Sequence, residues 1–326
     1  MQTVKALWAV AALAAAILGV AGPANAIANG QNVPQGRYVF AVKLTMTGIP
    51  DGDGTRDSSC TGSLLTSEWV ITAGHCFKDS AGRHVSRTVA ARTTATVGRA
   101  DLRTRTGHVS TVVAVRQATG SDVSLAKIDP PITDIPPIHL RTKAPTVGMT
   151  LRLAGFGDTG RDRPTAKILQ TGTFEVVSRS TKVLGISGRE PDASTSACEH
   201  DSGGPYFAVD TAGKAELVAV VSKGPSCPHV GPDTAARVDA VAGWITSTVG
   251  KSHLNQPFVT VTPRTRSSPS PPSRSPVTAA APPDSAPVIP WKLALPVMAG
   301  LLTVAAVHTL QRRTRRRRRA ARSRGA

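Results

Sequence analysis

The chain has 326 residues, enough for one large domain or two smaller ones together with flanking segments. Its formal net charge is +18, but nine arginines lie in residues 312–324, and removing these and Lys5 leaves about +8 for the rest. The central part is therefore only mildly basic, so its net charge gives no reason to expect nucleic acid as a partner.

The first 26 residues have the pattern of a secretory signal peptide. Lys5 provides a positive start, residues 6–19 are almost all apolar, and residues 24–26 (Ala-Asn-Ala) fit the small-residue rule for cleavage. Residues 26–28 (Ala-Ile-Ala) fit the same rule, so cleavage after residue 26 or after residue 28 is possible. The alternative, a retained N-terminal membrane anchor, is disfavoured by the length of the apolar run.

Residues 27–250 are predicted to be the folded domain, with an antiparallel all-β architecture. Short apolar segments rich in Val, Thr and Ile alternate with clusters of Gly, Pro and Asp, which is typical of strands joined by tight turns. The strands are expected within residues 38–46, 69–73, 109–117, 150–157 and 216–222. Residues 238–249 have helical spacing instead, because their four apolar residues at positions 238, 241, 245 and 249 fall on one helix face.

The C-terminal part predicts a membrane anchor. Residues 251–290 contain ten prolines among Ser, Thr and Arg, a composition that stays extended as a linker. Residues 291–310 are then mostly apolar and long enough to span a membrane, with Trp291 and Lys292 at the interface. The arginines of residues 311–326 would remain inside by the positive-inside rule.

The arginine-rich tail has a second interpretation, as a nucleic-acid-binding segment. No aromatic residues are interleaved with its arginines, so base stacking has no platform, and the topological interpretation is preferred. The folded domain would then face the outside of a cell, and a bacterial surface protein suits the combination of segments.

Four cysteines lie in the folded domain: Cys60, Cys76, Cys198 and Cys227. An even number in an exported chain indicates two disulfides, with three possible pairings. No Cys-x-x-Cys and no histidine cluster accompanies them, so we expect neither a metal site nor a cofactor. The DGDG of residues 51–54 is interpreted as a hairpin turn, because an EF-hand loop would need a glutamate at its twelfth position.

Three short segments indicate the chemistry: WVITAGHC with His75, GSDVSLAKI with Asp122, and CEHDSGGPYF with Ser202. Each alone is compatible with an ordinary structural role. Acyl transfer, however, needs a hydroxyl nucleophile, a base that takes its proton and a carboxylate that orients the base. These three residues provide all three groups. The remaining histidines, among them His229, are interpreted as structural or surface residues.

In these segments the chain resembles the trypsin-like (chymotrypsin-family) serine proteases. The order His, Asp, Ser is that of the family, TAGHC is similar to its TAAHC, and DSGGP is identical to its nucleophile motif. Further similarity lies in Gly155-Phe156-Gly157, Arg237-Val238 and Trp244-Ile245. The resemblance implies two six-stranded antiparallel β-barrels with a C-terminal helix, and an active site in the cleft between the barrels.

The resemblance also implies several pairings. Cys60 would pair with Cys76 beside the histidine, and Cys198 with Cys227 beside the substrate pocket. The backbone amides of His200 and Ser202 would form the oxyanion hole. Residues 27–30 (Ile-Ala-Asn-Gly) are similar to the family's mature N-terminus, whose free ammonium pairs with the carboxylate before the nucleophile. That pair would be Ile27 and Asp201, so cleavage after residue 26 by signal peptidase would itself activate the enzyme.

For the substrate pocket, the resemblance implies Ser196, Ser222, Gly224 and Asp233. Ser196 matches the base of the pocket, the position at which an aspartate in the family indicates cleavage after Lys or Arg. Asp233 stands where a glycine usually keeps the pocket open. It would either attract a basic side chain, fill the pocket and favour small side chains, or be buried and satisfied by its neighbours. Lys223 replaces a tryptophan beside the substrate backbone.

The sequence therefore predicts a monomeric serine endopeptidase, anchored at the outer cell surface and acting on protein or peptide substrates. The alternative is an inactive homologue that uses its cleft as a binding module. His200 is the feature that favours this alternative, because most family members have glycine there and a side chain could close the oxyanion hole.

Overall fold

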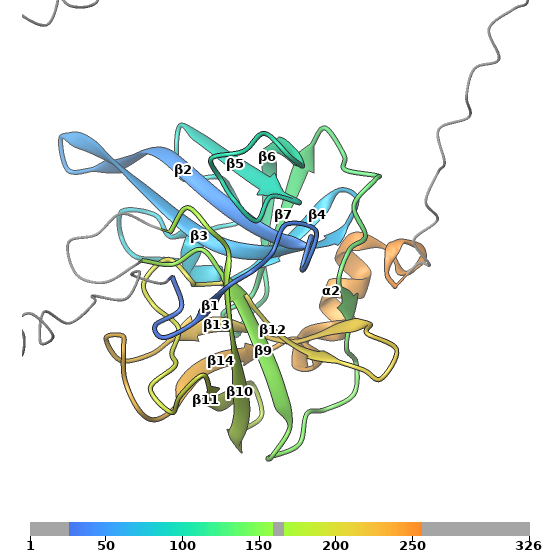
Figure 1. Cartoon of the computed structure of the whole chain (residues 1–326). Helices are drawn as coiled ribbons and strands as arrows, with labels where there is room; N and C mark the ends of the chain where they lie inside the picture. Colours follow the sequence, from blue (N-terminus) through green and yellow to red (C-terminus); the bar gives the residue numbers. More distant parts are fainter. Residues whose placement is uncertain (1–25, 159–165, 256–326) are drawn as a thin grey trace, which may run out of the picture. The chain divides into compact units, whose positions relative to one another are not determined.

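The computed structural model describes residues 26–158 and 166–255 (Figure 1). The expected signal peptide up to residue 25, most of the proline-rich linker, the apolar segment 291–310 and the arginine-rich tail lie outside the described residues. Within the described ranges, no helix is long and apolar enough to cross a membrane.

The first half of the domain is a closed six-stranded antiparallel barrel with the strand order β2-β3-β4-β7-β6-β5. The turn between its first two strands is a tight hairpin in which Asp51 pairs with Gly54, as the DGDG segment predicts. The six strands are β2 (Ala41–Asp51), β3 (Gly54–Thr66), β4 (Trp69–Thr72), β5 (Arg92–Val97), β6 (His108–Gln117) and β7 (Ser124–Asp129).

The second half is a barrel of the same kind, in the order β9-β10-β11-β14-β13-β12, closed by pairing of β12 with β9. Two short strands extend it: β1 (Gln31–Asn32) pairs with β10, and β8 (His139–Leu140) runs parallel to β13. The barrel strands are β9 (Thr150–Gly155), β10 (Gln170–Arg179), β11 (Val183–Glu190), β12 (Pro205–Val209), β13 (Ala215–Lys223) and β14 (Asp233–Arg237).

The strands form because apolar residues alternate along them and fill the barrel interiors. Leu44, Leu64 and Leu125 are fully buried in the first barrel. In the second barrel, Phe174 and Tyr206 pack edge to face with ring centroids 5.2 Å apart. Each barrel thus has its own core, and the loops between strands are free to build a site where the barrels meet.

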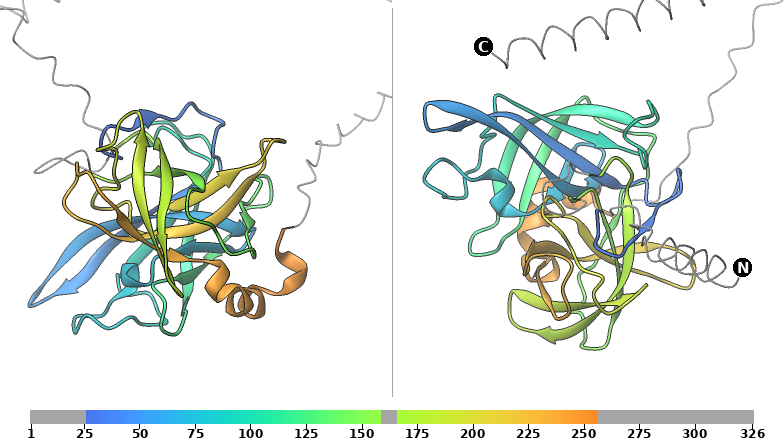
Figure 2. Two further views of the ribbon diagram at one scale, coloured as in Figure 1. Left: turned by 90° about the horizontal axis from the view of Figure 1, so that it is seen from below. Right: turned by 60° about the vertical axis from the view of Figure 1, so that its left-hand side comes forward.

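The C-terminal segment is helical but not as one helix. A 3-10 turn, η2 (Asp239–Val241), precedes the α-helix α2 (Ala242–Val249), because Val241 leaves helical geometry at φ −122°, ψ 13°. Val238, Ile245 and Val249 are buried in the same cluster as the first-barrel core. A last 3-10 turn, η3 (Lys251–His253), follows. Figure 2 shows α2 (orange) on the outer side of the two barrels.

Candidate active site

His75 lies in the 3-10 turn η1 (Gly74–Phe77), directly after the short strand β4. The disulfide between Cys60 in β3 and Cys76 in this turn ties the histidine loop to the barrel wall. The second disulfide joins Cys198 to Cys227 beside the nucleophile loop. These are the two pairings that the family resemblance implies.

Asp122 precedes strand β7 and holds His75 at two points. One carboxylate oxygen accepts the backbone N–H of His75 at 2.8 Å, and the other lies 2.8 Å from the ring Nδ1. Ser222 Oγ donates a third hydrogen bond to this carboxylate at 2.6 Å. Burial raises the pKa of Asp122, but the hydrogen bonds from His75 and Ser222 outweigh it and bring the pKa to about 2. The carboxylate is therefore ionised at neutral pH and fixes the Nδ1–H tautomer.

Ser202 approaches His75 from the second barrel, in the turn that precedes strand β12. The next residue, Gly203, has a φ of +80°. A Cβ at this position would collide with Thr72 Oγ1 and with the backbone nitrogen of Ala73, the residue that follows β4. Glycine is therefore required for the nucleophile turn to reach the first barrel. His75 and Ser202 line one cavity of about 260 Å³ together with Cys76 and His200. The described residues show no direct hydrogen bond between their side chains, a contact that often tightens only when substrate binds.

His200 has a positive φ of 70°, the left-handed backbone conformation that glycine adopts most readily. Its ring Nδ1 lies 2.8 Å from the carbonyl oxygen of Ser59 in β3, and this contact directs the side chain toward the first barrel. Within the described ranges, the backbone N–H groups of His200 and Ser202 donate no hydrogen bond. Both amides are thus available to a negatively charged oxygen of a ligand.

Asp201 is completely buried behind the nucleophile. Its two oxygens accept the backbone N–H groups of Gly157 and Cys198, at 2.8 and 2.9 Å. Burial raises the pKa of Asp201 to about 8 in this chain, in which Ile27 is still joined to Ala26. Ile27 is buried, and a Cβ on Gly157 would lie 2.6 Å from Asp201 Cγ and 2.8 Å from Ala26 O. The 26–27 peptide bond therefore lies beside this carboxylate.

Lys43 is a buried charge that the sequence alone did not single out. Its Nζ donates hydrogen bonds to Ser59 Oγ at 2.8 Å and to Phe156 O at 2.9 Å. The N–H of the same peptide group belongs to Gly157 and donates to Asp201. The ammonium and the carboxylate thus lie at opposite ends of one peptide group. Its signal in the sequence was a lysine inside the apolar run YVFAVKLTM.

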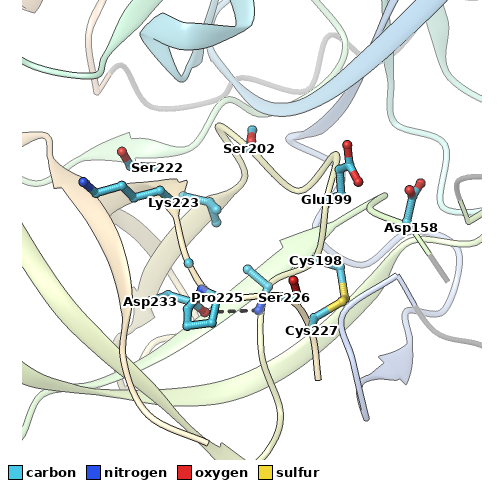
Figure 3. Close-up of a pocket in the computed structure, with 13 residues that line it drawn as sticks. Asp158, Cys198, Glu199, Ser202, Ser222, Lys223, Pro225, Ser226, Cys227 and Asp233 are labelled. Carbon is cyan, nitrogen blue, oxygen red and sulfur yellow. Dashed lines mark hydrogen bonds between the residues drawn. A yellow bond between two sulfur atoms is a disulfide. The ribbon is translucent and has the colours of Figure 1, made fainter. Parts of the chain in front are cut away.

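A cavity of about 580 Å³ opens beside Ser202 and is lined by residues of the 198–202 and 221–227 segments together with Asp158, Ala197 and Asp233 (Figure 3). Ser222 and Gly224 lie on its wall. Ser196 is only 1% exposed, and its Oγ accepts the backbone N–H of His229. Asp233, rather than Ser196, therefore presents its side chain to the cavity.

His229, interpreted as a structural or surface residue, contacts Asp233, which lines this cavity. Nε2 is 3.1 Å from an oxygen of Asp233. The four-residue spacing between the two was the available signal.

No group of three or more His, Cys, Asp or Glu residues in the described ranges is arranged to hold a metal ion.

Comparison with known proteins agrees with this geometry. The sequence profile of the family described as Trypsin matches residues 27–245. A trypsin-like protease of Streptomyces glaucescens is 31% identical over 241 residues, covering 68% of this chain and 82% of its own. Trypsin 5G1 of Aedes aegypti is 27% identical (69% and 85% covered), and Trypsin-1 of Salmo salar is 26% identical (58% and 81% covered). The match includes both barrels and the start of α2, and the chain belongs to the trypsin family of serine proteases.

Proposed function

We propose that this protein is a serine endopeptidase that hydrolyses peptide bonds of protein or peptide substrates. One observation carries the proposal: His75, fixed by the ionised Asp122, lines the same cavity as Ser202. A base, its orienting carboxylate and a hydroxyl are the groups that acyl transfer requires.

In the first step, Ser202 Oγ forms a bond to the substrate carbonyl carbon while its proton passes to His75 Nε2. The carbonyl oxygen becomes negative and accepts the backbone N–H groups of His200 and Ser202, each of which contributes roughly 3 kcal/mol in comparable sites. Asp122 stabilises the imidazolium that forms. His75 then gives the proton to the leaving nitrogen as the C–N bond breaks. Water repeats the sequence and releases the acid product.

The alternative, an inactive binding module, rested on His200 closing the oxyanion hole. The positive φ of His200 and its ring contact with Ser59 favour catalysis, because the backbone reaches the glycine-like conformation and the ring lies toward β3. No further observation favours the binding module.

We also propose how the enzyme is activated and where it acts. Signal peptidase would cut after Ala26 and release the Ile27 ammonium beside Asp201, which orders the nucleophile loop without a separate propeptide. This is supported by the position of the 26–27 peptide bond against Gly157. The apolar segment 291–310 and the arginines after it support anchoring in a membrane with the protease domain outside.

The test is hydrolysis of a fluorescein-labelled, unfolded protein by the chain that begins at Ile27. We expect Ser202→Ala to lower the rate by 10³-fold or more, the range typical for loss of a nucleophile of this kind. Ser247→Ala, on the exposed face of α2, is the matched control and should keep the rate within about twofold. Equal rates for this chain with and without Ser202→Ala would refute the proposal.

A further inference from the structure

The peptide group between Gly74 and His75 is held at both of its ends. Its N–H, which belongs to His75, donates to Asp122 Oδ1 at 2.8 Å. Its carbonyl oxygen, which belongs to Gly74, accepts a hydrogen bond from Gln117 Nε2 at 3.0 Å. Gln117 is the last residue of β6, and Asp122 lies just before β7. The two side chains that fix the backbone of His75 therefore come from one hairpin.

The orientation of the Gln117 amide is set by its partners. Nε2 also donates to the carbonyl oxygen of Val85 at 3.2 Å. Because both partners are carbonyl oxygens, only the NH₂ side of the amide can face them, and Oε1 points away from both. Ser86 Oγ accepts the backbone N–H of Gln117 at 3.2 Å. The same residue therefore ties the segment around residues 84–86 to the end of β6.

Gln117 Oε1 is buried and has no hydrogen-bond partner among the residues that the structure describes. Leaving a buried acceptor unpaired is costly. A Cβ added to Gly74 would lie 2.9 Å from this oxygen and 3.0 Å from His84 Nδ1. Asp122 Oδ1 lies 3.1 Å from the same point. Three polar atoms from three segments thus face one spot, and the His84 ring nitrogen is the one among them that can donate.

We propose that Gln117 is a positioning residue for His75, and that His84 supplies the donor to Gln117 Oε1. The inference rests on the proposed function, in which His75 takes the proton of Ser202. Because Gln117 and Asp122 hold opposite ends of one peptide group, loss of the Gln117 donor lets this group rotate and weakens the bond from His75 N–H to Asp122. The imidazole moves with its backbone, and a displacement of about 1 Å at a reacting group can cost roughly 100-fold in rate.

The first experiment compares steady-state hydrolysis of a peptide amide by variants of the chain that begins at Ile27. Gln117→Met keeps the length of the side chain and removes its N–H donors. We expect kcat to fall by roughly 10- to 100-fold and KM to change by less than about threefold, because the substrate pocket is untouched. Val115→Ala, at a fully buried position of the same strand, is the matched control. It should lower the midpoint of thermal unfolding but keep kcat within about twofold. Equal losses of kcat in the two variants, or an unchanged kcat in Gln117→Met, would overturn the proposal.

The second experiment follows the position of His75 without catalysis. In the chain that begins at Ile27 and carries Ser202→Ala, proton NMR detects the Nδ1 proton of His75, which is shifted downfield by its charge-assisted hydrogen bond to Asp122. Gln117→Met should move this signal upfield and broaden it, whereas Val115→Ala should leave it in place. An unmoved signal in Gln117→Met would contradict the positioning role. A signal that responds, in a protein whose unmutated chain hydrolyses no substrate, would refute the proposed function and leave the positioning role standing.

The role of His84 is tested by rescue. His84→Leu removes the nitrogen that faces Gln117 Oε1 and should lower kcat by about threefold or more, whereas His84→Asn places an amide donor near the position of Nδ1 and should recover most of the loss. In the Gln117→Met background, His84→Leu should have no further effect, since the acceptor that it serves is gone. Additive losses in the double variant, or no recovery in His84→Asn, would show that His84 does not act through Gln117 and would contradict this part of the proposal.

Discussion

Asp122 shows how single side chains set the chemistry of this site. Its pKa of about 2 results from hydrogen bonds that outweigh burial. Because the folded pKa lies below the unfolded value, its contribution to stability is present above about pH 4 and is lost as the pH falls toward 2. The carboxylate therefore stays ionised throughout neutral and mildly acidic conditions, so protonation of Asp122 does not limit activity in that range.

Replacing Asp122 by asparagine tests this role. The amide would hold the wrong imidazole tautomer of His75, and in the family's reference triad the same change lowers kcat by about 10⁴-fold. We expect a fall of this order in kcat, with KM changed by less than about threefold, measured by peptide-amide hydrolysis. Asp129→Asn, at the exposed end of β7, is the control. A loss of less than tenfold for Asp122→Asn would contradict the assignment.

His200 provides a second residue-scale prediction. Its left-handed backbone costs roughly 1–2 kcal/mol relative to glycine, and its ring hydrogen bond to Ser59 recovers a similar amount. His200→Gly should therefore change the free energy of unfolding by less than about 1 kcal/mol and kcat/KM by less than about tenfold. A 100-fold gain in kcat/KM would show instead that the ring obstructs the oxyanion hole.

The sequence allowed the main site residues to be predicted because their motifs are local. His75 and Ser202 each lie in a short segment with a recognisable pattern, and so do the cysteines. Lys43 was missed because the fold brings its partners to it from distant parts of the sequence. The lysine in β2 meets a peptide group more than 100 residues away, and a lysine in an alternating strand is usually expected to face solvent.

At the scale of elements, apolar periodicity predicted the strands well where they contain long apolar runs. The expected segment 38–46 became β2, which begins at Ala41 because Tyr38 has a positive φ of 50°. Strand β3 was not predicted, since its first half (GTRDSS) is polar and its register comes from pairing with β2. The helix expected at residues 238–249 is shorter, because geometry at Val241 interrupts it.

The buried ammonium of Lys43, in strand β2, provides a prediction about stability. Burial lowers the pKa of Lys43 to about 8, even though Asp201 and Asp158 raise it. Lys43→Met removes two hydrogen bonds and leaves Asp201 without this nearby cation. We expect the free energy of unfolding at pH 8 to fall by about 1–3 kcal/mol, with a smaller loss at pH 5, where Asp201 is protonated.

The control for this variant is Lys127→Met, on the half-exposed face of β7, which should cost less than about 1 kcal/mol. Denaturant unfolding of the full chain at the two pH values provides the measurement. Equal losses for Lys43→Met at pH 5 and pH 8 would show that Lys43 and Asp201 are not coupled.

For the whole molecule, the proposed cleavage before Ile27 predicts a change in the pH dependence of stability. In the uncleaved chain the folded state keeps a proton on Asp201 up to about pH 8, whereas the unfolded state releases it near pH 4. The uncleaved chain should therefore lose stability as the pH rises from 4 to 8. A free Ile27 ammonium would lower the pKa of Asp201 and remove this loss.

We thus expect the chain that begins at Ile27 to be more stable than the uncleaved chain by at least about 1 kcal/mol at pH 8, with the difference shrinking toward pH 4. Asp201→Asn should abolish the pH dependence of the difference. Chemical denaturation of both forms across this range is the measurement, and a difference that does not vary with pH would contradict activation through this pair.

The central claim is that Ser202 is an activated nucleophile, and fluorophosphonate labelling of the chain that begins at Ile27 tests it most directly. The mass of the peptide that contains Ser202 should increase by one phosphonyl group, on molecules whose N-terminus is Ile27, and Ser202→Ala should remain unlabelled. A folded chain that begins at Ile27 but gains no label at Ser202 would contradict this claim. The alternative, an inactive binding module, would then be favoured.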